Sequence, residues 1–278
     1  MGAYRETRTL QFEREGAWLT IWLDRPETRN ALSAEMADDL MATARALHED
    51  ADIRGVTFRG RGGTFCAGGD LKGFRDIVSG EMTTDQVAAF SRHAGELFHL
   101  VNELPQVTVM LVEGTAMAGG VGLACAGDVV ISSSDAQFAL TETMLGIPPA
   151  QIAPLVVQRI GPSAARRIML TGARLNAAEA LRIGLVDELA ADADALTARE
   201  ASIRTDALRC APGANAETKR LVLAATRLDT HSMMDMAADS FARCLTGPEG
   251  REGVAAFLEK RKPSWARDGG DLDRKSVV

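Results

Sequence analysis

One acidic residue, Glu142, ends a glycine-rich stretch whose residue types suit the binding of an anion, or of an oxygen that becomes negative during a reaction. The stretch begins at Gly114 and has small residues at positions 114, 116, 118, 119 and 120. Small residues let the backbone approach another group closely, and a helix that starts among them begins with free N–H groups. Such N–H groups stabilise an oxygen that becomes negative during a reaction, and a carboxylate nearby can move a proton.

A second glycine-rich segment, Gly60–Asp70, has the same setting in the chain. It follows a predicted strand at 55–59 and precedes a predicted helix at 71–77, as the first stretch follows a strand at 107–112 and precedes a helix at 121–126. Either turn alone is typical of close packing between elements. Two such turns side by side can offer one N–H each to a single oxygen, which is an oxyanion hole.

Other catalytic motifs are absent from the sequence or broken in it. A dinucleotide fingerprint fails at Cys125, and neither a phosphate-binding P-loop nor a serine-hydrolase G-x-S-x-G is present. The four histidines form no ligand cluster, so no metal is predicted. Cys66 borders a glycine turn, but no histidine stands near it in sequence, so we interpret it as a small buried thiol.

Composition is that of a globular protein. The 278 residues are 46% hydrophobic and 25% charged, with a net charge of −7, which argues against a general nucleic-acid partner. No apolar run approaches the roughly 20 residues that cross a bilayer, so no membrane partner is expected. The N-terminus has no signal-peptide core, and the four cysteines are widely spaced. We therefore expect a cytoplasmic protein with reduced thiols.

The elements that must position the glycine turns alternate between strands and helices, which predicts an α/β fold. A hairpin is predicted at 7–23, a helix capped by Ser33 follows, and a long helix covers 85–103. After Pro149 the pattern is nearly all helical. Helices are predicted at 149–160, 162–170, 177–183, 194–210, 215–226, 232–245 and 248–260.

The glycine-rich segments also carry a family resemblance. F-C-A-G-G-D-L at 65–71 and G-T-A-M-A-G-G-V-G-L-A-C-A-G-D at 114–128 resemble the two signature regions of the enoyl-CoA hydratase/isomerase (crotonase) superfamily. Three further segments match it, namely R-P-E-T-R-N-A-L at 25–32, F-A-L-T-E-T-M-L-G at 138–146 and A-x-E-A-L-x-x-G-L-V-D at 177–187. The resemblance extends to about residue 262.

This resemblance implies an architecture and partners. It implies an α/β crotonase (ClpP-like) spiral of ββα repeats over residues 1–200, with a C-terminal helical trimerisation region over 201–262. The charged tail, 263–278, is expected to be flexible. The implied partners are an acyl-CoA thioester substrate and further copies of the chain, in a trimer or hexamer. No cofactor is expected, because coenzyme A is part of the substrate.

The resemblance also implies a site. Its oxyanion pair falls on the N–H groups of Ala67 and Gly119, and its proton-transfer carboxylate falls on Glu142. The last of the CoA-contacting residues, Lys260, is expected to reach the CoA of a neighbouring subunit. The residues implied to meet CoA are Arg25, Arg29, Ala31, Ala67, Gly69, Asp70, Leu71, Gly119, Gly120, Thr141 and Lys260.

Gly122 departs from the superfamily pattern. Hydratases of the superfamily carry two glutamates, and the first falls on Gly122, which cannot transfer a proton. The leading interpretation is hydration of an α,β-unsaturated acyl-CoA by Glu142 alone. The alternatives are a Δ3,Δ2-enoyl-CoA isomerase, which also needs one carboxylate, and a non-catalytic acyl-CoA-binding protein. The glycine also leaves room for a bulkier substrate, or for a substrate carboxylate that assists.

A second departure is P-P-A-Q-I-A-P at 148–154, where many relatives have a glycine-rich segment. Together with V-V-Q-R-I-G at 156–161 and C-A-P-G-A-N-A at 210–216, it is most similar to the isohexenylglutaconyl-CoA hydratases. This resemblance implies a branched glutaconyl-CoA as the substrate.

Overall fold

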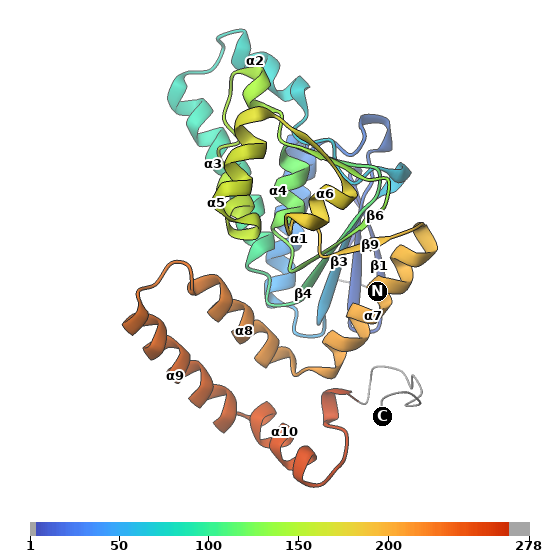
Figure 1. Cartoon of the computed structure of the whole chain (residues 1–278), viewed down its shortest axis with the longest axis vertical. Helices are drawn as coiled ribbons and strands as arrows, with labels where there is room; N and C mark the ends of the chain where they lie inside the picture. The colour runs from blue at the N-terminus through green and yellow to red at the C-terminus, as the bar shows by residue number, and fades with distance from the viewer. Residues whose placement is uncertain (1–3, 267–278) are drawn as a thin grey trace.

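A mainly parallel sheet forms the centre of the molecule (Figure 1). The computed structural model describes residues 4–266, without the side chains of residues 71, 72, 75 and 76. The sheet has the strand order β1-β2-β3-β4-β6-β9; only the β1–β2 hairpin is antiparallel, and Gly16 turns it with φ +59°. These strands are β1 Leu10–Glu15, β2 Trp18–Leu23, β3 Gly55–Gly60, β4 Val107–Val112, β6 Val129–Ser133 and β9 Glu188–Ala190.

Helices cover both faces of this sheet. Strands β3 and β4 are almost wholly buried, as their continuous apolar sequences require of a parallel sheet. One face packs into a large core with α1, α3 and α4, and α7 covers the other face through Leu196 against Val109 and Ile131. The helices are α1 Ala34–Glu49, α2 Arg75–Val78, α3 Thr84–Asn102, α4 Gly119–Cys125, α5 Ala153–Thr171, α6 Ala177–Arg182, α7 Ala193–Arg209, α8 Pro212–Ala224, α9 Thr230–Thr246 and α10 Pro248–Leu258.

Short polar sequences fix where the helices near the site begin. The Ser33 hydroxyl accepts from the N–H of Met36 and caps α1, as predicted. Thr83 and Gln86 form a capping box at the start of α3. Five 3₁₀ turns complete the described elements: η1 Pro26–Thr28, η2 Arg61–Gly63, η3 Leu71–Phe74, η4 Glu142–Leu145 and η5 Ser264–Ala266.

A second, smaller sheet lies beside the first and carries the glycine turns. It contains β5 Thr115–Met117, β7 Gln137–Ala139 and β8 Arg174–Asn176, and β5 and β7 are parallel. Single parallel bridges extend it, one from Cys66 to Ala116 and one from Leu32 to Gly69. The chain after Cys66, the chain after β5 and the chain after β7 therefore leave neighbouring positions at one edge.

Helices α8, α9 and α10 lie apart from this core (Figure 1). The largely buried Lys219 of α8 ties them to it, because its Nζ lies 2.6 Å from an Asp128 carboxylate oxygen and 2.6 Å from the Gln106 carbonyl oxygen. Burial lowers the pKa of Lys219, and the charge of Asp128 opposes this. Helix α7 runs without a break through residues 200 and 201, where the sequence placed the end of the core domain.

Part of the predicted tail is folded. Residues Ser264–Ala266 form η5, and the indole Nε1 of Trp265 donates to the Arg209 carbonyl at 3.1 Å. The rest of that segment, 267–278, lies outside the described residues. None of the described helices combines the length and the apolar character that a membrane span requires.

Candidate active site

The two glycine turns pack directly against each other. A Cβ atom on Gly120 would lie 2.3 Å from the Cys66 carbonyl oxygen, and one on Gly68 would lie 2.7 Å from that of Met117. Gly68 also has φ +90°, which side chains other than glycine rarely allow. The predicted approach of these two turns therefore depends on residues that lack a side chain.

Two backbone N–H groups converge where the turns meet. Gly119 is the first residue of α4, and the nitrogen of Gly69 lies 3.8 Å from the position of a Cβ on Gly119. In the parallel bridge between Leu32 and Gly69, the hydrogen bonds to Leu32 are made by Gly68 and Asp70. The N–H of Gly69 itself therefore points away from Leu32. Within residues 4–266, neither of these two N–H groups donates to a protein acceptor. They are arranged as an oxyanion hole.

This geometry corrects the prediction that Ala67 supplies one of the donors. The N–H of Ala67 donates to the Arg29 carbonyl oxygen at 3.0 Å and is not available to a ligand. The left-handed conformation of Gly68 turns the chain between Ala67 and Gly69, so the two N–H groups face different neighbours. The N–H placed beside Gly119 is that of Gly69, which the sequence had assigned only to CoA binding.

Glu142 stands at the same edge as the two donors. It begins η4, directly after β7, and the N–H of Ala118 donates to the Ala139 carbonyl at 2.8 Å across the two parallel strand ends. The carboxyl group is half-buried, and its Oε2 is buried without a hydrogen-bond partner in the described part of the chain. Burial raises the pKa of Glu142 above its ordinary value, and its own backbone N–H opposes that rise. A raised pKa suits a group that both takes and returns a proton.

The room expected at Gly122 is already filled. A Cβ on this residue would lie 2.1 Å from Cγ2 of Ile152 and 3.5 Å from Cε1 of Phe98. The sequence-based idea that the glycine leaves space for a bulkier substrate is therefore wrong for this position. Segment 148–154, which the sequence marked as unusual, supplies the side chain that fills the space.

Arg25 holds the protein segments around the site together. Its guanidinium donates to the Ala31 carbonyl oxygen at 2.9 Å and lies 3.3 Å from an Asp70 carboxylate oxygen. Asn30, which sequence reasoning missed, is fully buried with φ +55°; its amide accepts from the N–H of Arg25 and donates to the Thr64 carbonyl at 2.6 Å. An asparagine tolerates this left-handed conformation better than most residues, and that is the signal the sequence carried.

The other predicted CoA residues divide into those near the glycine turns and one far away. Gly120 is buried against Cys66, and Thr141 is the half-buried residue before η4. Arg29 is exposed with φ +54°, Leu71 begins η3, and the side chain of Leu71 lies outside the described atoms.

Lys260 is the distant residue. It is exposed just beyond α10, and Figure 1 places the end of that helix away from α4. A single chain does not bring Lys260 to the site, and its predicted role toward a neighbour stays a prediction.

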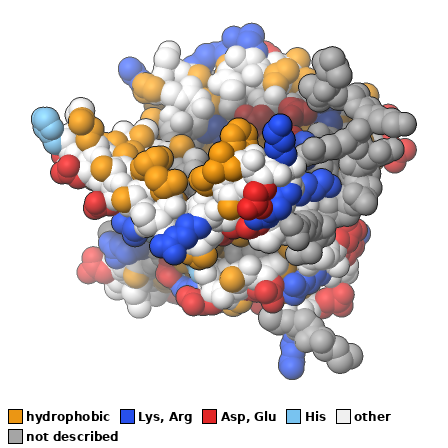
Figure 2. Space-filling model, turned by 90° about the horizontal axis from the view of Figure 1, so that it is seen from below, with side chains coloured by type: hydrophobic (Ala, Val, Ile, Leu, Met, Phe, Trp, Pro, Cys, Tyr) orange, Lys and Arg blue, Asp and Glu red, His pale blue; other side chains and the backbone are white. Residues whose placement is uncertain are grey.

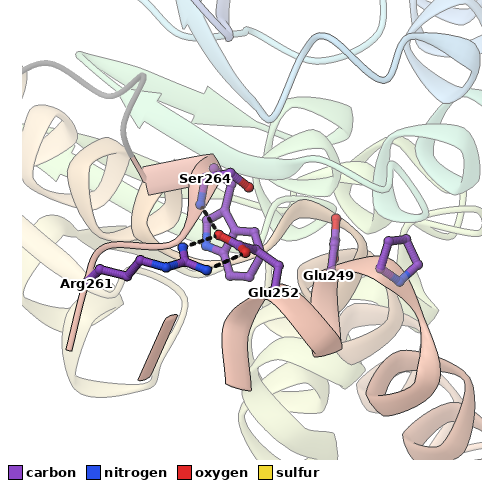
Figure 3. Close-up of a pocket in the computed structure, with 6 residues that line it drawn as sticks. Glu249, Glu252, Arg261 and Ser264 are labelled. Atoms are coloured by element: carbon purple, nitrogen blue, oxygen red, sulfur yellow. Dashed lines mark hydrogen bonds and ion pairs between the residues drawn. The ribbon is translucent and has the colours of Figure 1, made fainter. Parts of the chain in front are cut away.

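Two other candidate features do not belong to this site. A hollow of about 540 Å³ among the C-terminal helices is drawn in Figure 3, but Glu252 is paired there with Arg261 at 2.7 Å and accepts from the N–H of Ser264 at 2.8 Å. Its polar groups thus hold α10 and η5 together. Cys66 is fully buried, which confirms the interpretation of a small buried thiol, and this burial raises the pKa of the thiol to about 12.

Comparison with known proteins decides the family. The sequence profile of the enoyl-CoA hydratase/isomerase family matches residues 13–268. This chain belongs to that family. The predicted resemblance to the crotonase superfamily is confirmed, and so is the predicted crotonase fold.

Relatives of the family match more than 90% of this chain. The solved structure of Pseudomonas aeruginosa AtuE is 46% identical, with a TM-score of 0.90 over 93% of this chain and 100% of that one. An enoyl-CoA hydratase/isomerase from Marinobacter aquaeolei is 39% identical, with a TM-score of 0.88 over 94% of this chain and 100% of that one. The carnitinyl-CoA dehydratase of Proteus mirabilis is 32% identical over 93% of this chain and 98% of its own length.

Proposed function

We propose that this family member is an enoyl-CoA hydratase that adds water to an α,β-unsaturated acyl-CoA with a single glutamate. The observation that carries the proposal is the meeting of two N–H groups without protein acceptors, at Gly69 and Gly119, beside the half-buried Glu142. Two donors aimed at a thioester oxygen stabilise the enolate more than the ground state. They therefore lower the barrier of the reaction and do not merely strengthen substrate binding.

The reaction then needs one proton to leave water and one to reach C2. Glu142, as a carboxylate, takes a proton from water while the water oxygen forms a bond to C3. The electron pair of the 2,3 double bond moves toward the thioester, and the enolate oxygen is held by the N–H groups of Gly69 and Gly119. Glu142 returns the proton to C2, and the net change is the addition of one water molecule. Each donor of this kind contributes about 2.7–4 kcal/mol to lowering the barrier.

The CoA portion is proposed to enter beside the Arg25–Leu32 segment. This segment lies along the oxyanion turn, since the N–H of Leu32 donates to the Gly68 carbonyl at 2.7 Å. The exposed Arg29 is the cation of this segment that faces solvent and can meet a phosphate. The guanidinium of Arg25 is bonded to the Ala31 carbonyl oxygen and to Asp70. Its proposed role is therefore to position the Arg25–Leu32 segment.

The substrate class is proposed to be a branched glutaconyl-CoA. The support is the resemblance of segments 148–154, 156–161 and 210–216 to isohexenylglutaconyl-CoA hydratases. Segment 148–154 also packs against Gly122 through Ile152, which is consistent with a part in substrate choice. The subtype stays a prediction. An acyl-CoA panel, with and without a distal carboxylate, tests it through the ratios of kcat/KM.

Replacement of Glu142 by glutamine tests the function. Glu142→Gln should lower kcat by about 10²–10⁴-fold, because an amide cannot accept the proton of water. Calorimetry with a saturated acyl-CoA should find binding largely unchanged. The matched control is Glu6→Gln, which changes an exposed carboxylate outside the site and should leave kcat as it is. Full activity of Glu142→Gln would remove Glu142 from the mechanism.

A Δ3,Δ2-enoyl-CoA isomerase is the second candidate. The observation that favours it is that Ile152, and not a carboxylate, fills the space at Gly122, and a proton shuttle between C2 and C4 needs no more than one carboxylate. Mass spectrometry separates the two reactions, because hydration adds the mass of water and isomerisation adds none. Tight binding of acyl-CoA without turnover across the panel would instead identify a binding protein.

The proposed enzyme is a homo-oligomer, a trimer or hexamer, assembled through its C-terminal helices. Figure 2, seen from the side of these helices, shows hydrophobic side chains gathered between charged ones. Phe241, Phe257 and Leu258 are 67%, 82% and 73% exposed in the single chain. Apolar surface of this extent is typical of a protein–protein interface.

A further inference from the structure

Gly122 of α4 faces the side chain of Ile152, the residue before α5. A Cβ on Gly122 would lie 2.1 Å from Cγ2 and 2.7 Å from Cβ of Ile152. Ile152 is 4% exposed, so its side chain occupies this volume inside the protein. An isoleucine from another segment therefore stands where the superfamily's first glutamate would begin.

Phe98 of α3 connects this isoleucine to the oxyanion hole. Its Cε1 lies 3.5 Å from a Cβ on Gly122, and its Cζ lies 3.7 Å from a Cβ on Gly119. The Cδ1 atom of Leu32 lies 3.2 Å from the same Cβ position on Gly119. Leu32, Phe98 and Ile152 thus form one apolar wall, which we call the Ile152 wall.

The spacing of Gly119 and Gly122 bears on where the wall would stand relative to the reacting carbons of the proposed reaction. Gly119 and Gly122 are three residues apart on one helix, which corresponds to about 4.5 Å along its axis. A thioester oxygen held at Gly119 places C2 and C3 of the acyl chain within that distance. An apolar wall offers no hydrogen bond to water or to a carboxylate, so placing either of them against this side would cost free energy.

The segment that carries Ile152 is fixed on both sides. Gln151 packs over Gly95 of α3, with its Oε1 2.3 Å from the position of a Cβ there, and its Nε2 donates to the Ser91 hydroxyl at 3.0 Å. Each of the two neighbours, Gln151 and Ile152, fits over a helix position that has no side chain. A side chain locked in this way discriminates between shapes better than one on a mobile loop.

We propose that Ile152 is a specificity-determining residue, which limits the substituent on the side of C3 that faces Gly122 and leaves acid–base chemistry to Glu142. The proposal rests on the hydratase function proposed above. It assigns the size limit at C3 to one side chain, opposite a glycine, and not to the general shape of the pocket.

The test measures two substrates that differ by one methyl group at C3, crotonyl-CoA and 3-methylcrotonyl-CoA. Ile152→Ala should raise the ratio of kcat/KM for the methylated over the plain substrate by about tenfold, the effect of one methyl group in an apolar pocket. The matched control is Ile131→Ala, which shortens another buried isoleucine on the α7 side of the sheet. It should leave the ratio unchanged, because a purely structural loss affects both substrates alike.

A size exchange provides the second test. Gly122→Ala alone should lower kcat/KM for both substrates, because its Cβ collides with Ile152. Adding Ile152→Gly removes both colliding atoms and leaves Phe98 at an ordinary 3.5 Å, so the double variant should recover activity relative to Gly122→Ala. An unchanged ratio in an active Ile152→Ala enzyme, or a double variant no better than Gly122→Ala, overturns the proposal. A wild-type chain that adds no water to any acyl-CoA overturns the hydratase function instead.

Discussion

Gly69 is the residue whose role differs most between sequence and structure. Its N–H is one of the two proposed oxyanion donors, whereas the N–H of Ala67 is bonded to the carbonyl oxygen of Arg29. The cause is a single left-handed glycine, Gly68, between them. A sequence motif does not show in which direction a backbone N–H points. The prediction therefore located the turn correctly and assigned the wrong N–H within it.

A pair of substitutions at Gly69 separates the N–H from the side chain. Gly69→Pro removes the donor and should lower kcat by about 10²–10³-fold. Gly69→Ala keeps the donor, and its Cβ would meet only Phe74 at 3.7 Å, an ordinary contact, so it should retain most activity. Steady-state kinetics on crotonyl-CoA measures both. Equal losses in the two variants would mean that the backbone donor has no special role.

The raised pKa of Glu142 has a consequence for the pH dependence of the reaction. Because the carboxylate must accept a proton from water, kcat/KM should fall as the pH drops through the raised pKa, above the ordinary carboxyl value of 4.5. The profile of kcat/KM between pH 4 and 9 measures this limb. An acidic limb at or below 4.5 would contradict the effect of burial.

Unfolding provides an independent check on that pKa. A pKa raised in the folded state favours the protonated form, so this contribution to stability is present at low pH and is lost as the pH rises through the folded pKa. The free energy of unfolding of wild type minus that of Glu142→Gln should therefore decrease with rising pH over the same range as the kinetic limb.

At the scale of elements, the helices were predictable and the short strands were not. Ser33 before α1 and Pro105 after α3 marked real helix ends, because capping and the effect of proline are local chemistry. Strands β5, β7 and β8 have three residues each, too few to show a period of two, and the sequence assigned β5 to a turn. Yet these strands are what aligns Gly119, Glu142 and the turn after Cys66.

Contacts between distant elements were the other part that the sequence could not provide. Gly122 was recognised as a missing carboxylate, and segment 148–154 was recognised as unusual, but nothing in either pattern joined them. Ile152 fits over Gly122 because α4 and the start of α5 pack together in three dimensions. Gly95 is similar, because a side chain there would collide with Gln151, which is 56 positions away in the sequence.

At the scale of the whole molecule, the distribution of apolar surface is uneven. The core helices bury their apolar faces, whereas α9 and α10 bury only one residue each, Ser240 and Ala256. Phe257 and Leu258 would each gain about 1.5–3 kcal/mol if they were fully covered. A chain that leaves such residues in water as a monomer would be prone to associate non-specifically, so a defined partner surface is the stable solution.

This surface predicts the state of the protein in solution. Light scattering after size-exclusion chromatography should give the wild type a mass of several 29.6 kDa chains, a trimer or a hexamer. Phe257→Ser combined with Leu258→Ser should shift it to the monomer, because the apolar area that drives association is lost. Val78→Ser is the matched control, as Val78 is 84% exposed on α2 and should leave the mass unchanged. A wild-type monomer, or a double variant that stays assembled, would show that α10 does not hold the oligomer together.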